Sequence, residues 1–443
     1  MTSGSKLICA LALAVLGSSA ATAVPTLAVN PASIATDELG TVRIDVGSVA
    51  GSQVILRLYV DANGNGVIDP LDDYVVWTDV VLDNVPDWSP NMFSDTDAAT
   101  GAVTVDVRLF GPLEFPYSAG NFIWQAEDSF DASTQTAVFS VTQTTQTQSV
   151  AGTVRDSITT FGVPGALVAL VPYCEEGDEA LRFYSAFANN NGDFVIQVPA
   201  EVECRNRILL AIKPGFLTSF TGQPDLVFDG TSQFTNQDPE VTPGTWIADG
   251  QLQYATGVQA GGGIPGVLMF IGSDDGLVSV AFTDENGDYS FLLDDGDWEL
   301  EAPEDGIDTR GAVSLEDSTS FTVSGGAAVI STLTLPAANA FFEGTLRDDV
   351  AATVAGHPVN ARRNGLCDPL CYDSFTYSRA DGTFSIGVVA PTSPATYDYS
   401  LAVESPLTGL VGETISCETI SLGQTLTGRD LDHFAPTNFV TGT

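Results

Sequence analysis

Residues 282–300 read FTDENGDYSFLLDDGDWEL, and this stretch indicates the fold more clearly than any other. The dipeptide Asn286-Gly287 favours the positive backbone φ angles of a tight hairpin turn. The aromatic Tyr289 follows and begins an alternating run of the kind that forms a half-buried β-strand. The stretch therefore predicts a hairpin, with one strand before the glycine turn and one after it.

The same turn recurs along the chain at a constant spacing. Its glycines are Gly192, Gly287 and Gly382, and each lies 95 residues after the one before it. An aromatic residue stands two positions after each of them. A second recurring turn has the form Gly-x-Pro and precedes an apolar strand; its copies are Gly162-Val163-Pro164, Gly263-Ile264-Pro265 and Gly356-His357-Pro358. A period of this length predicts a domain-sized repeat.

The fold class follows from the lack of helical periodicity and from frequent turns, with 43 glycines and 23 prolines. Runs at 41–46 and 103–107 also alternate with period two, so the segment before the repeats should form a further sandwich. A polar run at 142–148 is typical of a linker, and weaker boundaries lie near 237–240 and 336–338. We predict an all-β protein of four tandem antiparallel β-sandwich domains, Ig-like or prealbumin-like, in an elongated rod. The expected boundaries are 1–23 for a signal peptide and then 24–147, 148–247, 248–337 and 338–443 for the sandwiches.

The repeats resemble the carboxypeptidase regulatory-like domain. The residues that carry the resemblance are GTVRD and GVPGALVAL, between Gly152 and Leu170, and the stretch from Phe282 to Leu300. The likeness extends over residues 148–443. That family is close in fold to the Cna B-type and transthyretin-like sandwiches. The resemblance implies non-catalytic spacer or binding domains, since the fold alone does not define an activity.

Residues 60–73, VDANGNGVIDPLDD, form a candidate calcium loop. Calcium loops of the EF-hand type take oxygen ligands from positions 1, 3, 5, 7, 9 and 12, with a glycine at position 6. Numbered from Asp61, the glycine is Gly66 and the ligands are Asp61, Asn63, Asn65, the carbonyl of Val67, Asp69 and Asp72. The alternative is a solvated acidic turn, but six matches in register favour calcium in a structural role.

The loop resembles the calcium loops of dockerins and differs from them in two respects. Position 12 is Asp72, where EF-hand loops carry glutamate, so the bidentate arm is shorter. The flanking segments at 54–60 and 74–77 are strand-like and not helical, which places the loop on a β-hairpin.

The first residues predict export. Met1 to Lys6 carry one positive charge, Leu7 to Leu16 are apolar, and Ala21-Thr22-Ala23 forms a small-x-small cleavage signal. This pattern is typical of a secretory signal peptide, with Val24 as the first mature residue. Because no later segment is long and apolar enough to cross a bilayer, we expect a secreted or cell-surface protein with no membrane span.

The charge is strongly negative, with 57 acidic residues against 15 basic ones and a formal net charge of −42. A polyanion without a basic patch is not expected to bind nucleic acid or an anionic membrane. An acidic, lysine-poor chain suits a medium rich in salt or calcium, where screening weakens its self-repulsion. The hydrophobic fraction of 44% indicates folded cores and not a disordered acidic tail.

Five cysteines follow the predicted signal peptide, and outside the cell they favour disulfides over zinc. Cys174 follows one expected strand, which ends at Pro172, and Cys204 precedes another, at 208–212. These positions allow the two cysteines to pair within one sandwich. Cys367 and Cys371 can pair locally and leave Cys417 free, or Cys417 can take either of them. One thiol remains unpaired or links two chains.

The chemistry-bearing residues do not indicate an enzyme. Only two histidines are present, His357 in a repeat turn and His433 near the end, and no nucleophile, zinc or phosphate-binding motif occurs. Asp and Glu are so abundant that no pair of them identifies a glycosidase. We therefore expect no catalytic residues and no enzymatic activity.

The sequence predicts a secreted structural or adhesive protein, a component of a surface, matrix or filament, stiffened by calcium and disulfides. Its partners would be copies of itself, other surface proteins or polysaccharide. The segment Val24 to Pro31 could be donated as a strand to another chain, although an ordinary first strand is the favoured interpretation. The alternative functions are an array of carbohydrate-binding modules and an accessory protein of a secreted hydrolase.

Overall fold

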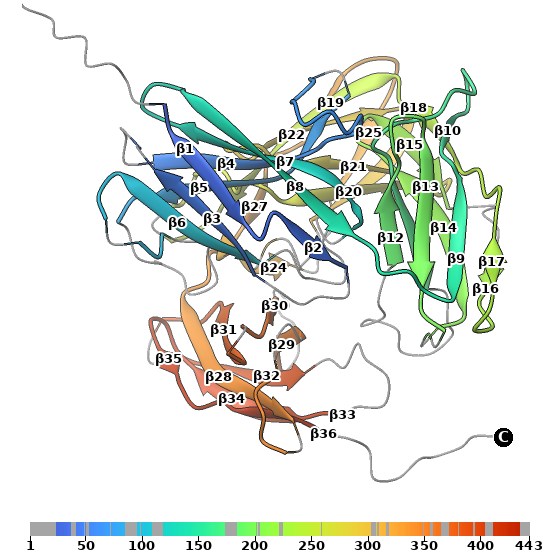
Figure 1. The fold of residues 1–443 in the computed structure, drawn as a ribbon. Helices are drawn as coiled ribbons and strands as arrows, with labels where there is room; N and C mark the ends of the chain where they lie inside the picture. The colour runs from blue at the N-terminus through green and yellow to red at the C-terminus, as the bar shows by residue number, and fades with distance from the viewer. Residues whose placement is uncertain are drawn as a thin grey trace, which may run out of the picture.

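The computed structural model describes residues 24–36, 41–47, 49, 53–70, 72–84, 95–97, 99–108, 118–172, 184–200, 202, 204–220, 225–257, 259–302, 307, 310–315, 319–348, 350–354, 358–364, 372–379, 381–392, 395–403 and 411–434. Within these residues the fold is all-β, as predicted, and its strands form several packed sheets (Figure 1). The predicted signal peptide lies outside the described residues.

No helix in the described part of the chain has the length and hydropathy needed to span a membrane.

The N-terminal domain is a sandwich of two sheets. One sheet has the strand order β1-β3-β6 and the other the order β2-β8-β7-β4-β5. This is an Ig-like arrangement, in which the first strand is divided between the two sheets. β1 pairs with β3 of its own domain, so the segment around Val24 to Pro31 forms an ordinary first strand here. The strands are β1 Thr26–Asn30, β2 Ser33–Ala35, β3 Thr41–Gly47, β4 Gln53–Val60, β5 Tyr74–Leu82, β6 Ala102–Arg108, β7 Gly120–Asp128 and β8 Thr134–Thr142.

Three further units follow and share one topology. In each unit the first strand pairs antiparallel with the strand after the Asn-Gly or Asp-Gly turn, and parallel with a strand near the end of the unit. Unit 1 contains β9 Gln148–Thr153, β10 Arg155–Asp156, β11 Leu167–Pro172, β12 Tyr184–Phe187, β13 Asp193–Val198, β14 Asn206–Ile212, β15 Phe216–Ser219, β16 Asp225–Val227, β17 Gln233–Phe234 and β18 Glu240–Pro243.

Units 2 and 3 repeat the strand pairings of unit 1 but differ from it in individual short strands. Unit 2 contains β19 Trp246–Tyr254, β20 Leu268–Ser273, β21 Leu277–Phe282, β22 Asp288–Leu293, β23 Gly296–Glu301, β24 Ser314–Leu315, β25 Thr319–Val323, β26 Ala328–Val329 and β27 Leu333–Leu335. Unit 3 contains β28 Ala340–Asp348, β29 Pro358–Arg363, β30 Tyr372–Tyr377, β31 Thr383–Val388, β32 Tyr397–Val403, β33 Val411–Gly412, β34 Thr414–Ile420, β35 Thr425–Leu426 and β36 Leu431–Phe434. The 95-residue period of the sequence thus corresponds to one structural unit.

The recurring glycine turn has the predicted backbone angle but not the predicted connection. Gly192, Gly287 and Gly382 have φ values of 82°, 77° and 79°. The strands that this turn joins lie in different sheets of the sandwich, as β21 and β22 do, so the expectation of a hairpin within one sheet is wrong. In unit 2 the turn is closed by Asp284, whose carboxylate accepts hydrogen bonds from the amides of Asn286 (2.8 Å) and Asp288 (3.0 Å).

The two recurring turns of a unit pack against each other. A Cβ on Gly162 or Gly263 would collide with the carbonyl of Asn191 or Asn286, in the second turn of the same unit. The first glycine of Gly-x-Pro is therefore required for close backbone approach. This contact explains why both motifs recur together in the sequence.

One sheet runs from unit 1 into unit 2, and one strand of unit 2 joins a sheet of unit 3. β15 of unit 1 pairs with β21 of unit 2, which produces one sheet with the order β10-β18-β15-β21-β20-β23-β25. β24 of unit 2 pairs in turn with β30 of unit 3. β18 lies in unit 1, so the polar residues at 237–240 do not separate domains. The polar run at 142–148 is also held to unit 1, because the side chain of Gln143 accepts a hydrogen bond from the amide of Gln197 (2.7 Å).

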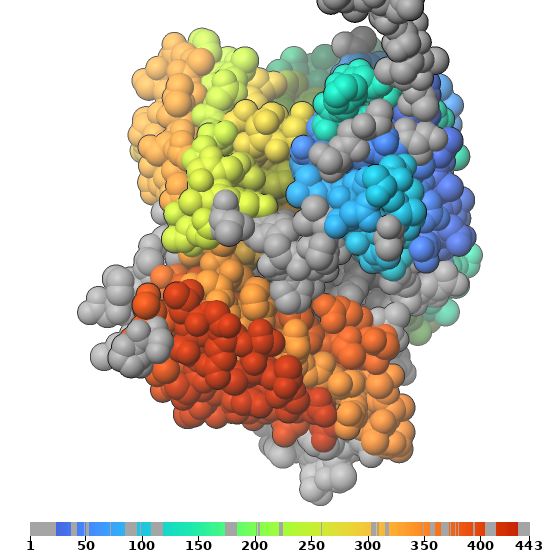
Figure 2. Space-filling model, turned by 90° about the vertical axis from the view of Figure 1, so that its left-hand side faces the viewer, coloured from blue at the N-terminus to red at the C-terminus, as the bar shows by residue number. Residues whose placement is uncertain are grey.

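The N-terminal domain and units 1 and 2 pack around one another, which differs from the rod expected from the sequence. One apolar core combines residues of the N-terminal domain with Leu167, Phe187 and Leu210 of unit 1 and Val280 of unit 2. Figure 2 shows the N-terminal domain in blue beside unit 2 in yellow, with unit 3 in orange and red below them. The N-terminal domain therefore contacts unit 2 directly and not only its neighbour in sequence.

A buried ion pair joins the N-terminal domain to unit 2. Arg310 of unit 2 reaches Asp79 on β5 (Nη1 to Oδ2, 3.0 Å), and its guanidinium lies 4.9 Å from the ring centre of Trp77. Arg310 and Asp79 are only 1% and 2% exposed. Burial raises the pKa of Asp79, and the charge of Arg310 opposes that rise.

Two glycines bring the units against the β4–β5 hairpin of the N-terminal domain. Gly165 and Gly266 follow the proline of the Gly-x-Pro turns and have φ values of 65° and 66°. A Cβ on Gly266 would collide with the backbone of Thr78, and one on Gly165 would lie 2.8 Å from the Cβ of Ala62. In unit 3 the residue after the proline is Val359, which is buried in β29. The fourth position of the turn thus differs between the units that dock on the hairpin and unit 3.

Candidate functional site

The candidate calcium loop connects β4 to β5 and is anchored at its base. Asp61 is 6% exposed, and its amide donates to the carbonyl of Asn121 on β7 (2.9 Å). At the other end Asp73 is 7% exposed and accepts hydrogen bonds from the amides of Ala62 (3.0 Å) and Asp69 (2.8 Å). Burial raises the pKa of Asp73, and the negative charges of Asp61 and Asp69 add to that rise.

Successive side-chain oxygens in the loop turn toward the backbone at 65–67. The carboxylate of Asp61 accepts from the amides of Asn65 (3.1 Å) and Gly66 (2.9 Å), and the side-chain oxygen of Asn63 accepts from the amide of Asn65 (3.0 Å). The side-chain oxygen of Asn65 accepts from the amide of Val67 (2.6 Å). Gly66 has a φ of 73°, so the predicted glycine stands where the chain turns sharply.

The predicted ligands are only partly brought together. Asp61, Asn63 and Asn65 share the hydrogen bonds of one turn, and oxygen donors of this kind suit Ca²⁺. Among the described residues, however, no three His, Cys, Asp or Glu side chains form a group that could hold a metal ion, so Asp61, Asp69 and Asp72 do not make such a cluster. The donor chemistry fits calcium, and the calcium site stays a prediction.

The loop borders unit 1, which the sequence did not indicate. Tyr74 donates from its hydroxyl to the carbonyl of Gly165 (2.8 Å), and Lys213 donates from Nζ to the carbonyl of Pro164 (2.7 Å). The ammonium group of Lys213 lies 5.8 Å from the ring centre of Tyr74. Burial lowers the pKa of Lys213, and the charges of Asp72 and Asp73 oppose that effect. Lys213 is the one lysine after the predicted signal peptide, and it lies at this interface.

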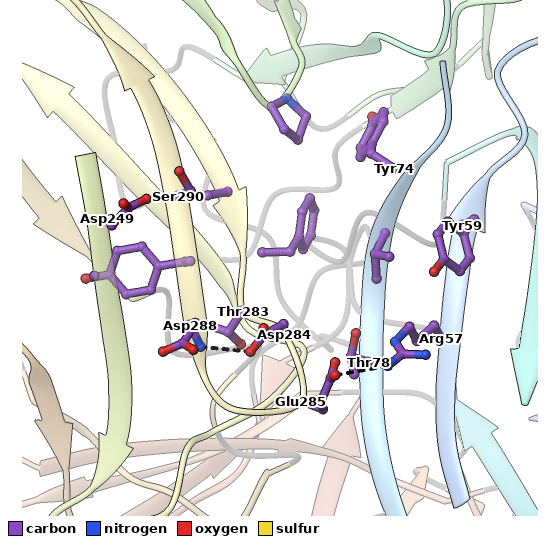
Figure 3. A pocket seen from close by; sticks show the side chains of 16 residues that line it. Arg57, Tyr59, Tyr74, Thr78, Asp249, Thr283, Asp284, Glu285, Asp288 and Ser290 are labelled. Carbon is purple, nitrogen blue, oxygen red and sulfur yellow. Dashed lines mark hydrogen bonds and ion pairs between the residues drawn. The ribbon is translucent and has the colours of Figure 1, made fainter. Parts of the chain in front are cut away.

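A groove of about 650 Å³ opens between the N-terminal domain and unit 2, a size common for ligand pockets. One wall is formed by β4 and β5 and the other by β19 and the β21–β22 turn, and Pro214 of unit 1 also lines the cavity. Figure 3 shows Tyr59 and Tyr74 on one side, with Asp249 and Ser290 opposite. We call this cavity the interdomain groove. Its lining residues are Arg57, Tyr59, Tyr74, Val75, Thr78, Pro214, Asp249, Gly250, Ala281, Phe282, Thr283, Asp284, Glu285, Asp288, Tyr289 and Ser290.

The groove is acidic. Its single cation, Arg57, is held between Glu127 (Nη1 to Oε2, 2.5 Å) and Glu285 (Nη2 to Oε1, 3.1 Å). Three more carboxylates line the groove, and none of them forms an ion pair within the described part of the chain: Asp249, Asp284 and Asp288. Desolvation raises the pKa of Asp288, and the charges of Asp284 and Glu285 raise it further.

Sequence reasoning missed this groove, because its walls are about 190 residues apart in the chain. Arg57 and Thr78 are ordinary strand positions, and Asp284 and Asp288 belong to a recurring turn. No local pattern predicts that the two segments meet. The signal that could have found them is the glycine after Gly-x-Pro in units 1 and 2, which permits the close docking.

The cysteines are only partly described. Cys204 is buried and forms a disulfide, whose partner is outside the described residues, as are Cys174, Cys367 and Cys371. Cys417 is free and exposed. The pairing of Cys174 with Cys204 stays a prediction, which non-reducing peptide mapping tests. His357 is also outside the described residues, and the backbone at His433 belongs to β36.

By its fold the chain is a multidomain β-sandwich protein with an oxygen-rich loop and an acidic interdomain groove. A scan against protein-family models finds no match, and no curated protein matches the sequence. The comparison therefore identifies no family, and the regulatory-like resemblance of the repeats stays a prediction.

Several solved structures are similar at a low level. The TIE protein of Bacillus anthracis is 10% identical, with a TM-score of 0.20, and the match covers 92% of this chain and 74% of that one. A streptococcal ancillary pilin is 11% identical, with a TM-score of 0.22 and coverage of 66% and 100%. BcpA, the major pilin subunit of Bacillus cereus, is 10% identical, with a TM-score of 0.17 and coverage of 65% and 99%. TM-scores this low carry no argument about the fold or function of this chain.

Proposed function

We propose that the protein is an exported structural or adhesive component of the cell exterior, in a surface, a matrix or a filament. The observation that carries this proposal is the apolar core shared by the N-terminal domain and units 1 and 2. Domains of one chain move relative to one another by default unless their interface is large and hydrophobic. A shared core and a buried ion pair thus suit a stiff body that transmits force or presents a surface.

Calcium and disulfides would add to this stiffness. The candidate calcium loop ends next to Tyr74, which donates a hydrogen bond to the carbonyl of Gly165 in unit 1. An ion bound in the loop would therefore fix the N-terminal domain against unit 1. Calcium sites of extracellular modules are weak and fill at millimolar concentrations. The role of calcium would therefore be structural.

The protein would act by attachment to copies of itself, to other surface proteins or to polysaccharide, and not by turnover of a substrate. With a net charge of −42, chains repel one another unless ions screen or bridge them. Assembly should therefore depend on calcium or salt.

The test is light scattering and negative-stain microscopy of the protein from Val24 onward, across a calcium and salt series. The proposal expects larger species, filaments or sheets, whose population rises with calcium or salt. Magnesium at equal concentration separates specific bridging by calcium from screening. Monomers in every condition, together with hydrolysis of any polymer in a substrate panel, would replace the proposal with an enzymatic function.

The second candidate is a set of carbohydrate-binding modules, alone or as an accessory to a secreted hydrolase. The tyrosine rings and carboxylates of the interdomain groove favour it, since sugars stack on aromatic rings and donate hydrogen bonds to carboxylates. A glycan array with the same protein distinguishes the two. Specific retention of one glycan class without self-assembly would favour the carbohydrate-binding function.

A further inference from the structure

We propose that the interdomain groove binds a basic side chain, arginine above all, from a segment of a partner protein. The inference rests on the proposed role in attachment and assigns that role a place in the molecule. The first reason is charge. Arg57 is already paired with two glutamates, while Asp249, Asp284 and Asp288 have no cationic partner among the described residues. The groove thus presents three uncompensated carboxylates to whatever enters.

The carboxylates are arranged around one opening. Asp284 is fixed by the amides of Asn286 and Asp288, and Asp249 and Asp288 are exposed at the rim. Figure 3 places Asp249 and Asp288 on the wall opposite Tyr59 and Tyr74. A guanidinium that enters between the walls would meet carboxylates on one side and aromatic rings on the other, which are the two surfaces that bind arginine best.

A second observation, independent of the charge, points to a ligand. Thr78 is 1% exposed, and its hydroxyl has no hydrogen-bond partner. Thr78 stands directly opposite Arg57 in the β4–β5 register, so its side chain points to the same face of the sheet, into the groove. Figure 3 shows it beside Glu285 and Arg57. Buried hydroxyls are rarely left unsatisfied, and an N–H group of a bound ligand would satisfy this one.

A neutral sugar fits these observations less well. It would stack on the tyrosines, but it would leave the mutual repulsion of the carboxylates in place. A basic side chain satisfies the hydroxyl and neutralises the carboxylates together. The long-range field of the polyanionic chain would also attract a basic segment and raise its rate of association.

The probe is a fluorescein-labelled triarginine peptide, titrated into the protein from Val24 onward at physiological salt, which screens the general field. The expected result is saturable binding that tricitrulline, the neutral isostere, does not compete for. Asp249→Asn with Asp288→Asn should weaken binding by about ten-fold, since two charge pairs are lost. Neither carboxylate accepts a hydrogen bond in the described structure, so the variant should fold.

The matched control is Asp274→Asn with Asp275→Asn, the same charge change at the exposed β20–β21 turn of unit 2. It should change the affinity by less than about two-fold. Thr78→Val should weaken binding by about three-fold, the loss of one hydrogen bond, and should keep or raise the melting temperature because it removes an unsatisfied hydroxyl.

Three results would overturn the inference. One is an equal loss of affinity in both double variants, which would mean attraction by the general field. Another is the absence of saturable binding of triarginine. The third is occupation of the groove by a neutral oligosaccharide or by Ca²⁺ alone. Because self-assembly is measured separately by light scattering, failure here leaves the proposed structural role standing.

Discussion

At the scale of single residues, the position of a charge affects stability more than the number of charges does. The chain carries 57 acids, and few of those in the described part of the chain are buried. A charge pair at the surface contributes little to stability. Asp79 is different, because it meets Arg310 in a buried ion pair that crosses from the N-terminal domain to unit 2. Removing one partner of such a pair leaves the other charge buried and unpaired.

Asp79→Ala should therefore lower the free energy of unfolding by about 3–5 kcal/mol, measured by urea denaturation. The double variant Asp79→Leu with Arg310→Met should recover most of that loss, because both charges are gone. The control is Arg43→Gln, which breaks an exposed, solvent-screened pair with Asp45 and should leave the urea denaturation curve almost unchanged. A small effect of Asp79→Ala would mean that water reaches this interface.

A second prediction concerns acid stability. Asp229 accepts hydrogen bonds from the amide of Thr231 (2.9 Å) and the hydroxyl of Ser232 (2.9 Å), and these lower its pKa. An aspartate whose pKa is lower in the folded state stabilises the fold above its unfolded pKa, and that contribution disappears as the pH falls through the folded pKa, below about pH 4. The melting temperature of Asp229→Asn should therefore fall less between pH 7 and pH 3 than that of the parent protein. Asp225→Asn is the control, because the Asp225 carboxylate accepts no hydrogen bond among the described residues, and it should show no such difference.

At the scale of elements, the turns direct the assembly of the molecule. Gly266 allows the backbone of unit 2 to meet the edge strand β5, which covers an edge that would otherwise be open to pairing. The same position in unit 1, Gly165, meets the base of the candidate calcium loop. One turn motif therefore serves two interfaces with the same hairpin.

Gly266→Ala should destabilise the protein by more than the usual cost of a positive φ, which is about 1 kcal/mol. The reason is that its Cβ would collide with the backbone of Thr78. Gly325→Ala is the matched control, with a similar φ of 63° and no atom within 4 Å of the added Cβ. Equal shifts in melting temperature for both variants would show that the docking contact is not tight.

The calcium loop yields a prediction at the same scale. Saturation of a weak site with millimolar calcium should raise the free energy of unfolding by about 1–2 kcal/mol, by the linkage of binding to folding. Chelation should lower the melting temperature of the protein from Val24 onward, and Asp61→Ala should abolish that difference. Glu299→Ala, distant from the loop in sequence, should retain it. Identical melting curves with and without chelator would leave the loop as an acidic turn.

At the scale of the whole molecule, packing replaces the expected extended array. A sandwich that buried its own core and touched only its neighbours would form a rod. Here the N-terminal domain shares a core with units 1 and 2 and is paired with unit 2 through Arg57–Glu285 and Asp79–Arg310. An isolated N-terminal domain would expose this apolar surface, so experiments on function need the longer chain.

Small-angle X-ray scattering tests the packing. A compact chain of this length has a radius of gyration of about 22 Å, and we expect a value of about 22–28 Å for the protein from Val24 onward. The variant Asp79→Ala should raise it if the interface opens. A value far above this range, together with a scattering profile of a rod, would contradict the packed arrangement.

The sequence by itself determined the all-β class, the three copies of one unit and the positive φ of the recurring glycines. These are local properties, because alternation and glycine turns act within a few residues of the chain. The sequence also indicated an oxygen-rich loop at 61–72, in which Asp61, Asn63 and Asn65 do share one turn.

Only the tertiary structure decided where the recurring turn leads, how the domains meet and where a ligand can enter. Asn286-Gly287 turns the chain from one sheet to the other, because the two halves of the sandwich pack face to face and the local pattern is compatible with either connection. The interdomain groove joins Arg57 to Asp284 and Asp288 across more than two hundred residues. Such contacts depend on which apolar surfaces are buried against each other when all the domains fold. Because the hydrophobic effect is non-directional, a local sequence pattern does not predict which surfaces these are.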